Sequence, residues 1–236
     1  MNIVVSHGPS YAVATALLEA GESVIAEAGA MVSMDPHVAI STYATESREA
    51  PRRRGCLGSL LSPFRRIFGG ESFYQNRFTT VQHPGSVTFA PGIPGDVAVA
   101  EVSAEAGVIL QNSAFLCSAE GVQIDTKWEG ARGFMAGEGV FMLRAQGDGL
   151  LAFNSFGAIK EVQVEDHYVV DSGHLVAFED SLEYDVRMFS RGIWKALFGG
   201  EAFVCEFSGR GRVWIQSRNT AAWGAMIGPK LPKRVR

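Results

Sequence analysis

Three copies of one short pattern constrain this chain more than any other feature. The pattern is LFGGEAFVCEF at Leu197–Phe207, IFGGESFYQNRF at Ile67–Phe78 and FMAGEGVFMLR at Phe134–Arg144. Each copy has an apolar pair, a small residue, a Gly-Glu pair and then residues typical of a β-strand. Self-similarity at a roughly fixed period is the sequence signature of a repeated structural unit. We therefore expect tandem modules rather than unrelated domains.

A second pattern alternates with the first. GAMVSMDPHVAI at Gly29–Ile40 aligns with SAFLCSAEGVQI at Ser113–Ile124 and with GHLVAFEDSLEY at Gly173–Tyr184. Each copy holds a small residue, an apolar triplet, an acidic turn and a second strand-like run. The simplest account is one β unit of three repeats, at about 1–94, 95–161 and 162–218, followed by a basic tail at 219–236.

Turns and apolar stripes complete the expected fold. Ser23–Ala26 and Ala30–Met34 are predicted to form a strand pair, and Gly147-Asp148-Gly149 and Gly209-Arg210-Gly211 each predict a hairpin turn. Residues near 57–68 and 187–198 space their large apolar side chains as short helices do, and each stretch ends at a Gly-Gly pair. The expected class is all-β, with pseudo-threefold symmetry and these two short helices.

Composition narrows the class of protein. The 236 residues are 47% hydrophobic and 19% charged, which is ordinary for a globular protein. The N-terminus lacks a secretory signal pattern, and no apolar run reaches the length of a membrane-spanning helix, so we expect a cytoplasmic protein. Cys56, Cys117 and Cys205 are odd in number and lie far apart without zinc spacing, which favours buried thiols.

The charge is unevenly distributed. The net charge is −4, yet the seven charged residues after Glu206 are all basic, so the preceding part carries −4 − 7 = −11. Such an acidic body with a basic end can guide self-assembly or contact with an anionic surface. The alternative is a solvated tail.

No residues with a clear catalytic pattern are present. Glu71, Glu138 and Glu201 could converge if the repeats surround an axis, but a Glu in a turn more often binds backbone N–H groups or faces solvent. The five histidines lack metal-ligand spacing, and no nucleophile, phosphate-binding or dinucleotide motif occurs. We therefore expect no enzyme activity, no metal and no cofactor.

A basic, apolar stretch is the main candidate contact surface. Residues 46–66 contain six Arg and two Glu beside large apolar side chains, a composition that suits an anionic membrane or a partner's groove. The alternative is packing on the protein's own sheet. The candidate contact residues are Arg52, Arg53, Arg54, Arg65, Arg66, Phe64 and Trp194.

Several motifs in order resemble one known family. ESVIAEAGAMVSMD, FGGESFYQNRFT, AFLCSAEGVQI, GEGVFMLRAQGDGLLAFNSFGAI and GEAFVCEFSGRGRVWIQSR, within about residues 2–218, resemble bacterial members of the altered-inheritance-of-mitochondria (mitochondrial biogenesis) family. The resemblance implies three tandem modules similar to the trp RNA-binding attenuation protein fold, a short double-stranded β-helix, and it implies trimers. It brings no catalytic residues, and its fungal members are linked to inner-membrane organisation.

These observations lead to a functional expectation. We expect a non-enzymatic assembly or scaffold protein that acts near a membrane surface, as a homotrimer in which the edge of the last module meets that of the first. The alternative is a nucleic-acid-binding module, by fold analogy. The Lys-Lys-Arg cluster with which the attenuation protein binds RNA has no match on these strands, so nucleic acid is not the favoured partner. A cupin-like enzyme would need clustered histidines.

Overall fold

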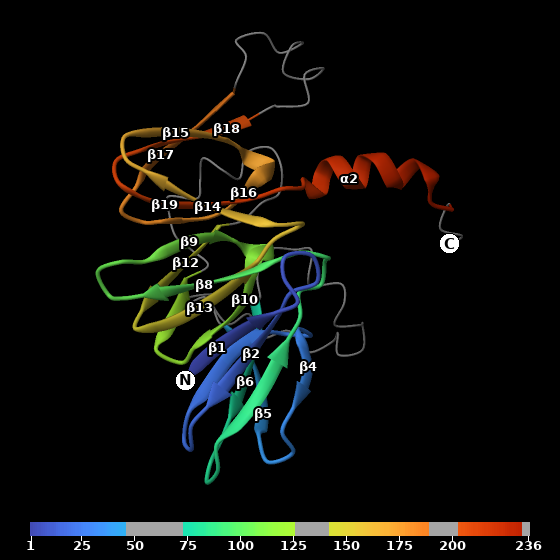
Figure 1. Cartoon of the computed structure of the whole chain (residues 1–236), viewed down its shortest axis with the longest axis vertical. Coiled ribbons are helices and arrows are strands. Elements are labelled where there is room, and N and C mark those ends of the chain that lie inside the picture. The colour runs from blue at the N-terminus through green and yellow to red at the C-terminus, as the bar shows by residue number, and fades with distance from the viewer. Residues whose placement is uncertain (46–72, 126–141, 189–202, 233–236) are drawn as a thin grey trace, which may run out of the picture.

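The fold is all-β, as the sequence predicts. The computed structural model describes residues 1–45, 73–125, 142–188 and 203–232. These residues form nineteen strands and, near the C-terminus, helix α2. After β1 (Asn2–Ser6), the strands fall into three consecutive groups of six, which lie one above the other in Figure 1.

The three groups are called units 1, 2 and 3. Unit 1 contains β2 (Val13–Leu18), β3 (Ser23–Glu27), β4 (Met31–Met34), β5 (Ala39–Thr45), β6 (Phe73–Thr79) and β7 (Gly85–Phe89). Unit 2 contains β8 (Val97–Val102), β9 (Val108–Gln111), β10 (Phe115–Ala119), β11 (Val122–Asp125), β12 (Met142–Gly147) and β13 (Gly149–Asn154). Unit 3 contains β14 (Ile159–Val164), β15 (His167–Asp171), β16 (Leu175–Glu179), β17 (Glu183–Met188), β18 (Phe203–Ser208) and β19 (Gly211–Gln216).

All three units have the same antiparallel pairing. In each, the sixth strand pairs with the first and third, and the fifth pairs with the second and fourth. The third strand carries a register shift at the same place, at Met31/Ser33, Phe115/Cys117 and Leu175/Ala177. The registers therefore define equivalent positions across the units. The pseudo-threefold symmetry itself stays a prediction.

The predicted hairpins are wrong. Strands on either side of Gly147-Asp148-Gly149 do not pair with each other, because β12 and β13 belong to different sheets. The same holds for β18 and β19 around Gly209-Arg210-Gly211, and for the predicted strand pair β3 and β4. Gly147, Gly149 and Gly209 have positive φ values of 113°, 145° and 103°, which an L side chain rarely adopts. These glycines turn the chain from one sheet into the next.

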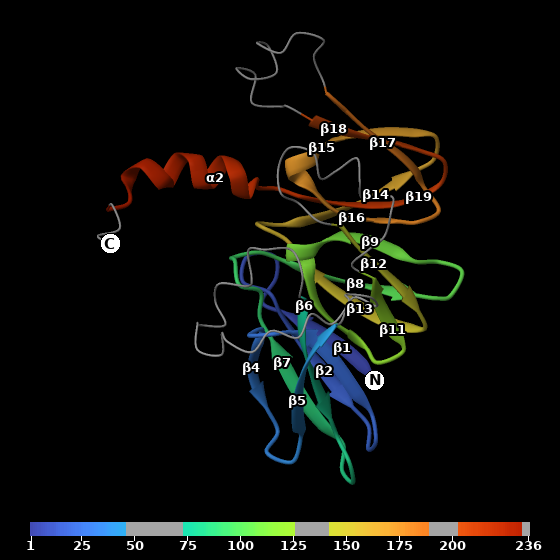
Figure 2. The same cartoon turned by 180° about the vertical axis from the view of Figure 1, so that it is seen from behind.

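Strand pairing joins neighbouring units into continuous sheets. β3 of unit 1 pairs with β10 of unit 2, and β9 of unit 2 pairs with β16 of unit 3. Each junction thus links the second strand of one unit to the third strand of the next, and each produces a six-stranded sheet. The stacked arrangement is visible from both sides in Figures 1 and 2.

The segments between units also contact each other. The Gly157 N–H donates to the Pro94 carbonyl (3.1 Å), and the Asp96 N–H donates to the Gly157 carbonyl (3.0 Å). At Gly95 an added Cβ would lie 1.7 Å from the Ser155 carbonyl oxygen, so only glycine fits there. Main chain therefore meets main chain directly where unit 1 leads into unit 2.

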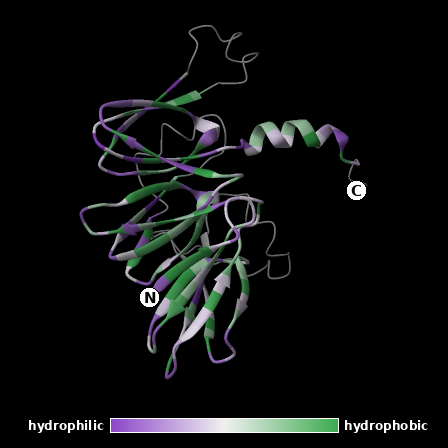
Figure 3. Ribbon diagram, in the orientation of Figure 1, coloured by the Kyte–Doolittle hydropathy of each residue, from purple (hydrophilic) through white to green (hydrophobic). Residues whose placement is uncertain are grey.

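Apolar side chains are buried within units and across a junction. Three clusters follow the three units, with apolar segments in the strands of each (Figure 3). The cluster of unit 2 also contains Trp214 of β19, whose ring meets Phe153 edge-on at 5.3 Å between centroids. Burying such aromatic pairs is a large stabilising contribution. Units 2 and 3 thus share part of one core.

The structure can be compared with the predicted repeat boundary, the two predicted helices and the predicted C-terminal tail. The predicted boundary at 161/162 falls inside β14, which pairs with β19 of unit 3. The helix predicted near 57–68 lies outside the described residues. Of the helix predicted near 187–198, the first two residues belong to strand β17, and the others lie outside the described residues. The 219–236 tail contains α2 (Thr220–Ile227) and a 3-10 turn, η5 (Gly228–Lys230). In the described part of the chain, no helix is long and apolar enough to cross a bilayer.

Candidate functional site

The candidate site consists of two edge strands, one in unit 1 and one in unit 3, whose equivalents in the other units pair across the internal junctions. β4, the third strand of unit 1, ends the sheet β1-β2-β7-β4, and β15, the second strand of unit 3, ends the sheet β15-β18-β17. At the equivalent positions inside the chain, β10 and β16 pair with β3 and β9. Among the described second and third strands of the units, β4 and β15 are therefore the two that do not pair with a neighbouring unit. One is a third strand and the other a second strand, which is the combination that pairs at both internal junctions.

Apolar side chains are exposed on the β4 edge. Val32 is 59% exposed, whereas Leu116 and Val176, at the same position in units 2 and 3, are 0% and 1% exposed. One residue earlier, Met31 is 38% exposed, and its two equivalents are fully buried. Leu116 and Val176 are covered by neighbouring parts of the chain, whereas the equivalent Val32 is not. Such an exposed apolar side chain marks a place where a partner can bind.

The β15 edge shows the same difference. Val169 is 53% exposed, while the equivalent Ile25 and Ile109 are 4% and 2% exposed. These three residues occupy one register position, since each is the Cα partner of the corresponding fifth-strand residue. An unpaired row of backbone N–H and C=O groups beside an apolar side chain is a template for another strand.

Charged pairs mark the internal junctions. Arg77 of β6 binds Glu120 (3.0 Å), and the equivalent Arg144 of β12 binds Asp180 (2.7 Å). The equivalent fifth-strand residue at the open end of unit 3 is Glu206, which pairs instead with Arg187 (3.1 Å). This position is thus occupied by a basic residue in units 1 and 2 and by an acidic residue in unit 3.

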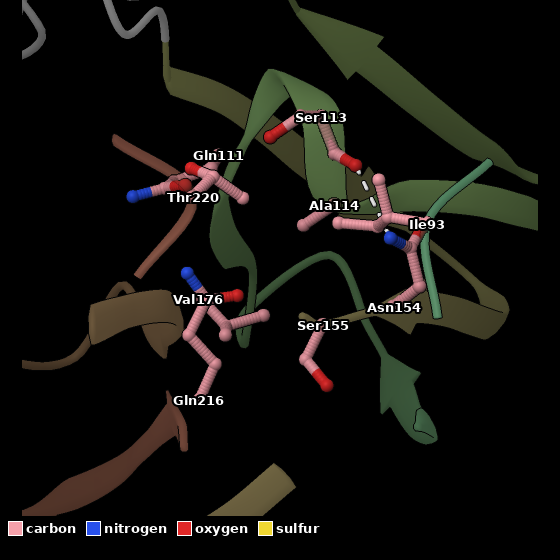
Figure 4. A pocket seen from close by; sticks show the side chains of 9 residues that line it. All are labelled: Ile93, Gln111, Ser113, Ala114, Asn154, Ser155, Val176, Gln216 and Thr220. Atoms are coloured by element: carbon pink, nitrogen blue, oxygen red, sulfur yellow. Dashed lines mark hydrogen bonds between the residues drawn. The ribbon is translucent and has the colours of Figure 1, made fainter. Parts of the chain in front are cut away.

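A small polar cavity lies between units 2 and 3. It has a volume of about 20 Å³, and Figure 4 shows its lining residues. These are Ile93, Gln111, Ser113, Ala114, Asn154, Ser155, Val176, Gln216 and Thr220. A space of this size holds about one water molecule.

The buried Asn154 explains the polarity of this cavity. Its amide N–H donates to the Ser113 carbonyl (3.3 Å), but its Oδ1 atom has no hydrogen-bond partner among the described residues. The equivalent Gln216 accepts at Oε1 from the Phe156 N–H (2.9 Å). The matching position before β8 is Pro94, which has no N–H to donate. We therefore expect one ordered water at Asn154.

Burial changes the pKa of two groups near the first junction. Loss of water raises the pKa of the Glu27 carboxyl, at the end of β3, to about 7. Loss of water likewise raises the pKa of the Cys117 thiol to about 12, so this thiol stays protonated near neutral pH. Cys117 and Cys205 are both buried, as predicted, and Cys56 lies outside the described residues.

The predicted site residues all fall outside the described part of the chain. They are Arg52, Arg53, Arg54, Arg65, Arg66, Phe64, Trp194, Glu71, Glu138 and Glu201. Within the described ranges, no group of three His, Cys, Asp or Glu side chains is placed to hold a metal ion.

Sequence reasoning missed the open-edge residues Met31, Val32 and Val169. The strand registers match Val32 with Leu116 and Val176, as the aligned sequence patterns do. An apolar residue that is exposed in one copy and buried in two carries no mark in the sequence. The only available signal was the order of the copies, which leaves a first third strand and a last second strand without partners.

Fold and edges together define a class of all-β proteins in which a repeated six-strand pairing extends through a chain with complementary open ends. The chain belongs to the family described as "Mitochondrial biogenesis AIM24", whose pattern matches residues 3–218. The family resemblance proposed from the sequence is thereby confirmed.

Two relatives support the same assignment. An uncharacterized protein of Streptococcus pyogenes serotype M6 is 27% identical over 219 residues, which cover 91% of this chain and 85% of that protein. A crystal structure of a Streptococcus pyogenes protein is similar with a TM-score of 0.73 at 25% identity, covering 98% of this chain and 99% of the other.

Proposed function

We propose that this protein is a non-enzymatic scaffold that assembles head to tail, with β15 of one copy pairing to β4 of the next. The exposed Val32, whose two equivalents are buried, is the observation that carries this proposal. Pairing in the register of the internal junctions would place Val170 opposite the next copy's Ser33, as Leu110 lies opposite Ala177. The contact would cover the apolar side chains of both edges and satisfy their backbone groups.

The head-to-tail contact determines the kind of assembly. A contact between two different surfaces closes into a ring when its rotation permits, and otherwise continues as a filament. The family resemblance indicates trimers, so the proposed assembly is a closed homotrimer. Its proposed role is to present repeated surfaces, including the acidic body and the basic C-terminal end, next to a membrane. A cytoplasmic location remains part of this proposal.

Cysteine cross-linking tests the proposed register. The variant Val170→Cys/Ser33→Cys should form disulfides between copies on mild oxidation and yield covalent trimers under denaturing, non-reducing conditions. Each single variant, Val170→Cys or Ser33→Cys, should remain a single chain. Absence of covalent trimers in the double variant, or equal cross-linking in a single variant, would count against the β15–β4 contact.

A further inference from the structure

Helix α2 leaves the body of the protein directly after β19. Asn219 caps it by accepting a hydrogen bond at Oδ1 from the Ala222 N–H (3.1 Å). The Trp223 ring meets Phe156 edge-on at 5.6 Å between centroids, which holds the first turn against the body. Figures 1 and 2 both show the rest of α2 projecting away from the sheets.

The projecting helix has one polar residue, Thr220, and is otherwise apolar. Its sequence, TAAWGAMI, contains no charged residue, and none of the eight residues is buried. Trp223 and Met226 are 50% and 59% exposed, and Leu231, just beyond the helix, is 61% exposed. A surface helix normally presents a polar outer face. Large apolar groups held in water in this way mark an interaction surface.

The charge beside α2 indicates what covers it. Lys230 is exposed at the end of the helix, and the chain has no acidic residue after Glu206. Lys233, Arg234 and Arg236 add three further positive charges in the sequence. Trp is enriched at membrane–water interfaces, and cations beside an apolar segment are attracted to anionic lipid surfaces.

The absence of a polar face in α2 favours a bilayer over a protein groove. A groove covers one side of a bound helix, and the other side then carries polar residues. In α2, Trp223, Met226 and Ile227 lie on one side and small uncharged residues on the other. Embedding in the headgroup region removes both sides from bulk water.

We propose that α2, with Lys230 and Leu231, is a contact element for anionic lipid surfaces. This inference rests on the membrane-surface part of the proposed function and does not depend on the β15–β4 contact. Met226, Leu231 and the exposed part of Trp223 enter the headgroup region, while Lys230 meets anionic lipid headgroups.

Co-sedimentation of the full chain with vesicles tests the proposal. The protein should pellet with phosphatidylcholine vesicles that contain phosphatidylserine, and much less with phosphatidylcholine alone. Trp223→Ser/Met226→Ser should lower the apparent partition coefficient by about tenfold or more. The matched control is Ile40→Ser/Val81→Ser, at two positions 47% and 68% exposed on unit 1, which should bind as the wild type does. Equal melting temperatures show that the variants are folded.

The other outcomes separate this inference from the proposed function. Binding that is kept in the α2 variant but lost in Arg52→Ser/Arg53→Ser/Arg54→Ser/Arg65→Ser/Arg66→Ser overturns the role of α2 and keeps the membrane role. No pelleting of the wild type overturns both. A change of oligomer mass in the α2 variant, without vesicle binding by the wild type, identifies a second copy as the occupant and also overturns the proposal.

Discussion

Arg144 and Asp180 form an ion pair at 2.7 Å across the junction between units 2 and 3. The same carboxylate accepts a hydrogen bond from the Gly107 N–H (3.0 Å) on the strand-connecting segment of unit 2. The equivalent pair at the other junction, Arg77 with Glu120, lies 3.0 Å apart. Asp180 has a side chain only 12% exposed, whereas Glu120 is 49% exposed. Both junctions thus contain an ion pair between arginine and a carboxylate, and the carboxylate is much more buried at the junction between units 2 and 3.

This difference predicts unequal effects of two matched substitutions. Asp180→Ala should lower the free energy of unfolding by about 1–3 kcal/mol, because it leaves a partly buried guanidinium and the Gly107 N–H without their acceptor. Glu120→Ala should change it by less than about 1 kcal/mol, since an exposed pair contributes little. Urea denaturation of both variants measures the difference. Equal losses would contradict the assigned role of burial.

Close main-chain contact between the two segments that link the units predicts a strict requirement for glycine at Gly95. Gly95→Ala should destabilise the protein by roughly 2–4 kcal/mol, because the new Cβ collides with the Ser155 carbonyl and forces the linking segments apart. Gly92→Ala is the control, since an added Cβ there meets nothing within 4 Å. Thermal unfolding should show a clear drop for the first variant only. A normal melting temperature for Gly95→Ala would refute this contact.

Glu27 predicts a dependence of stability on pH. The pKa of its carboxyl is raised to about 7 in the folded protein from an ordinary value of 4.5, so the folded state keeps a proton that the unfolded state loses. The stabilisation is complete below the unfolded value and is lost as the pH rises through about 7. Glu27→Gln should therefore match the wild type near pH 4.5 and exceed it by about 2–3 kcal/mol at pH 8. Chemical denaturation at both pH values measures this. A variant less stable than the wild type at pH 8 would contradict the burial of an ionisable carboxyl here.

Much of the fold could be predicted from repeated patterns, because side-chain alternation and turn residues recur with each unit. The alignment of Val32 with Leu116 and Val176 is one such success. Which sheet each strand joins could not be predicted, because a glycine turn serves equally in a hairpin and in a connection between sheets. The turns at Gly147 and Gly209 were misassigned for this reason.

The sequence also did not predict which residues of units 2 and 3 are equivalent in their fifth strands. Counting from the Gly-Glu pairs at Gly137 and Gly200 makes Phe207 the residue of unit 3 that is equivalent to Arg144 of unit 2. The strand registers show that the equivalent residue is Glu206. A slip of one residue moves a side chain to the other face of a strand. The charge reversal at the open end of unit 3 was therefore invisible to the sequence patterns. The open edges themselves depend on three-dimensional pairing.

Molar mass in solution, measured by sedimentation equilibrium at micromolar concentration, tests the proposed head-to-tail assembly most directly. The proposal predicts 3 × 25.4 kDa, about 76 kDa, for the wild type. Val32→Asp places a charge in the β15–β4 contact and should yield single chains of 25.4 kDa. Val81→Asp, at an exposed residue that lies in neither β4 nor β15, should keep the trimer mass. A wild type of 25.4 kDa, or a Val32→Asp variant of unchanged trimer mass, would contradict the assembly.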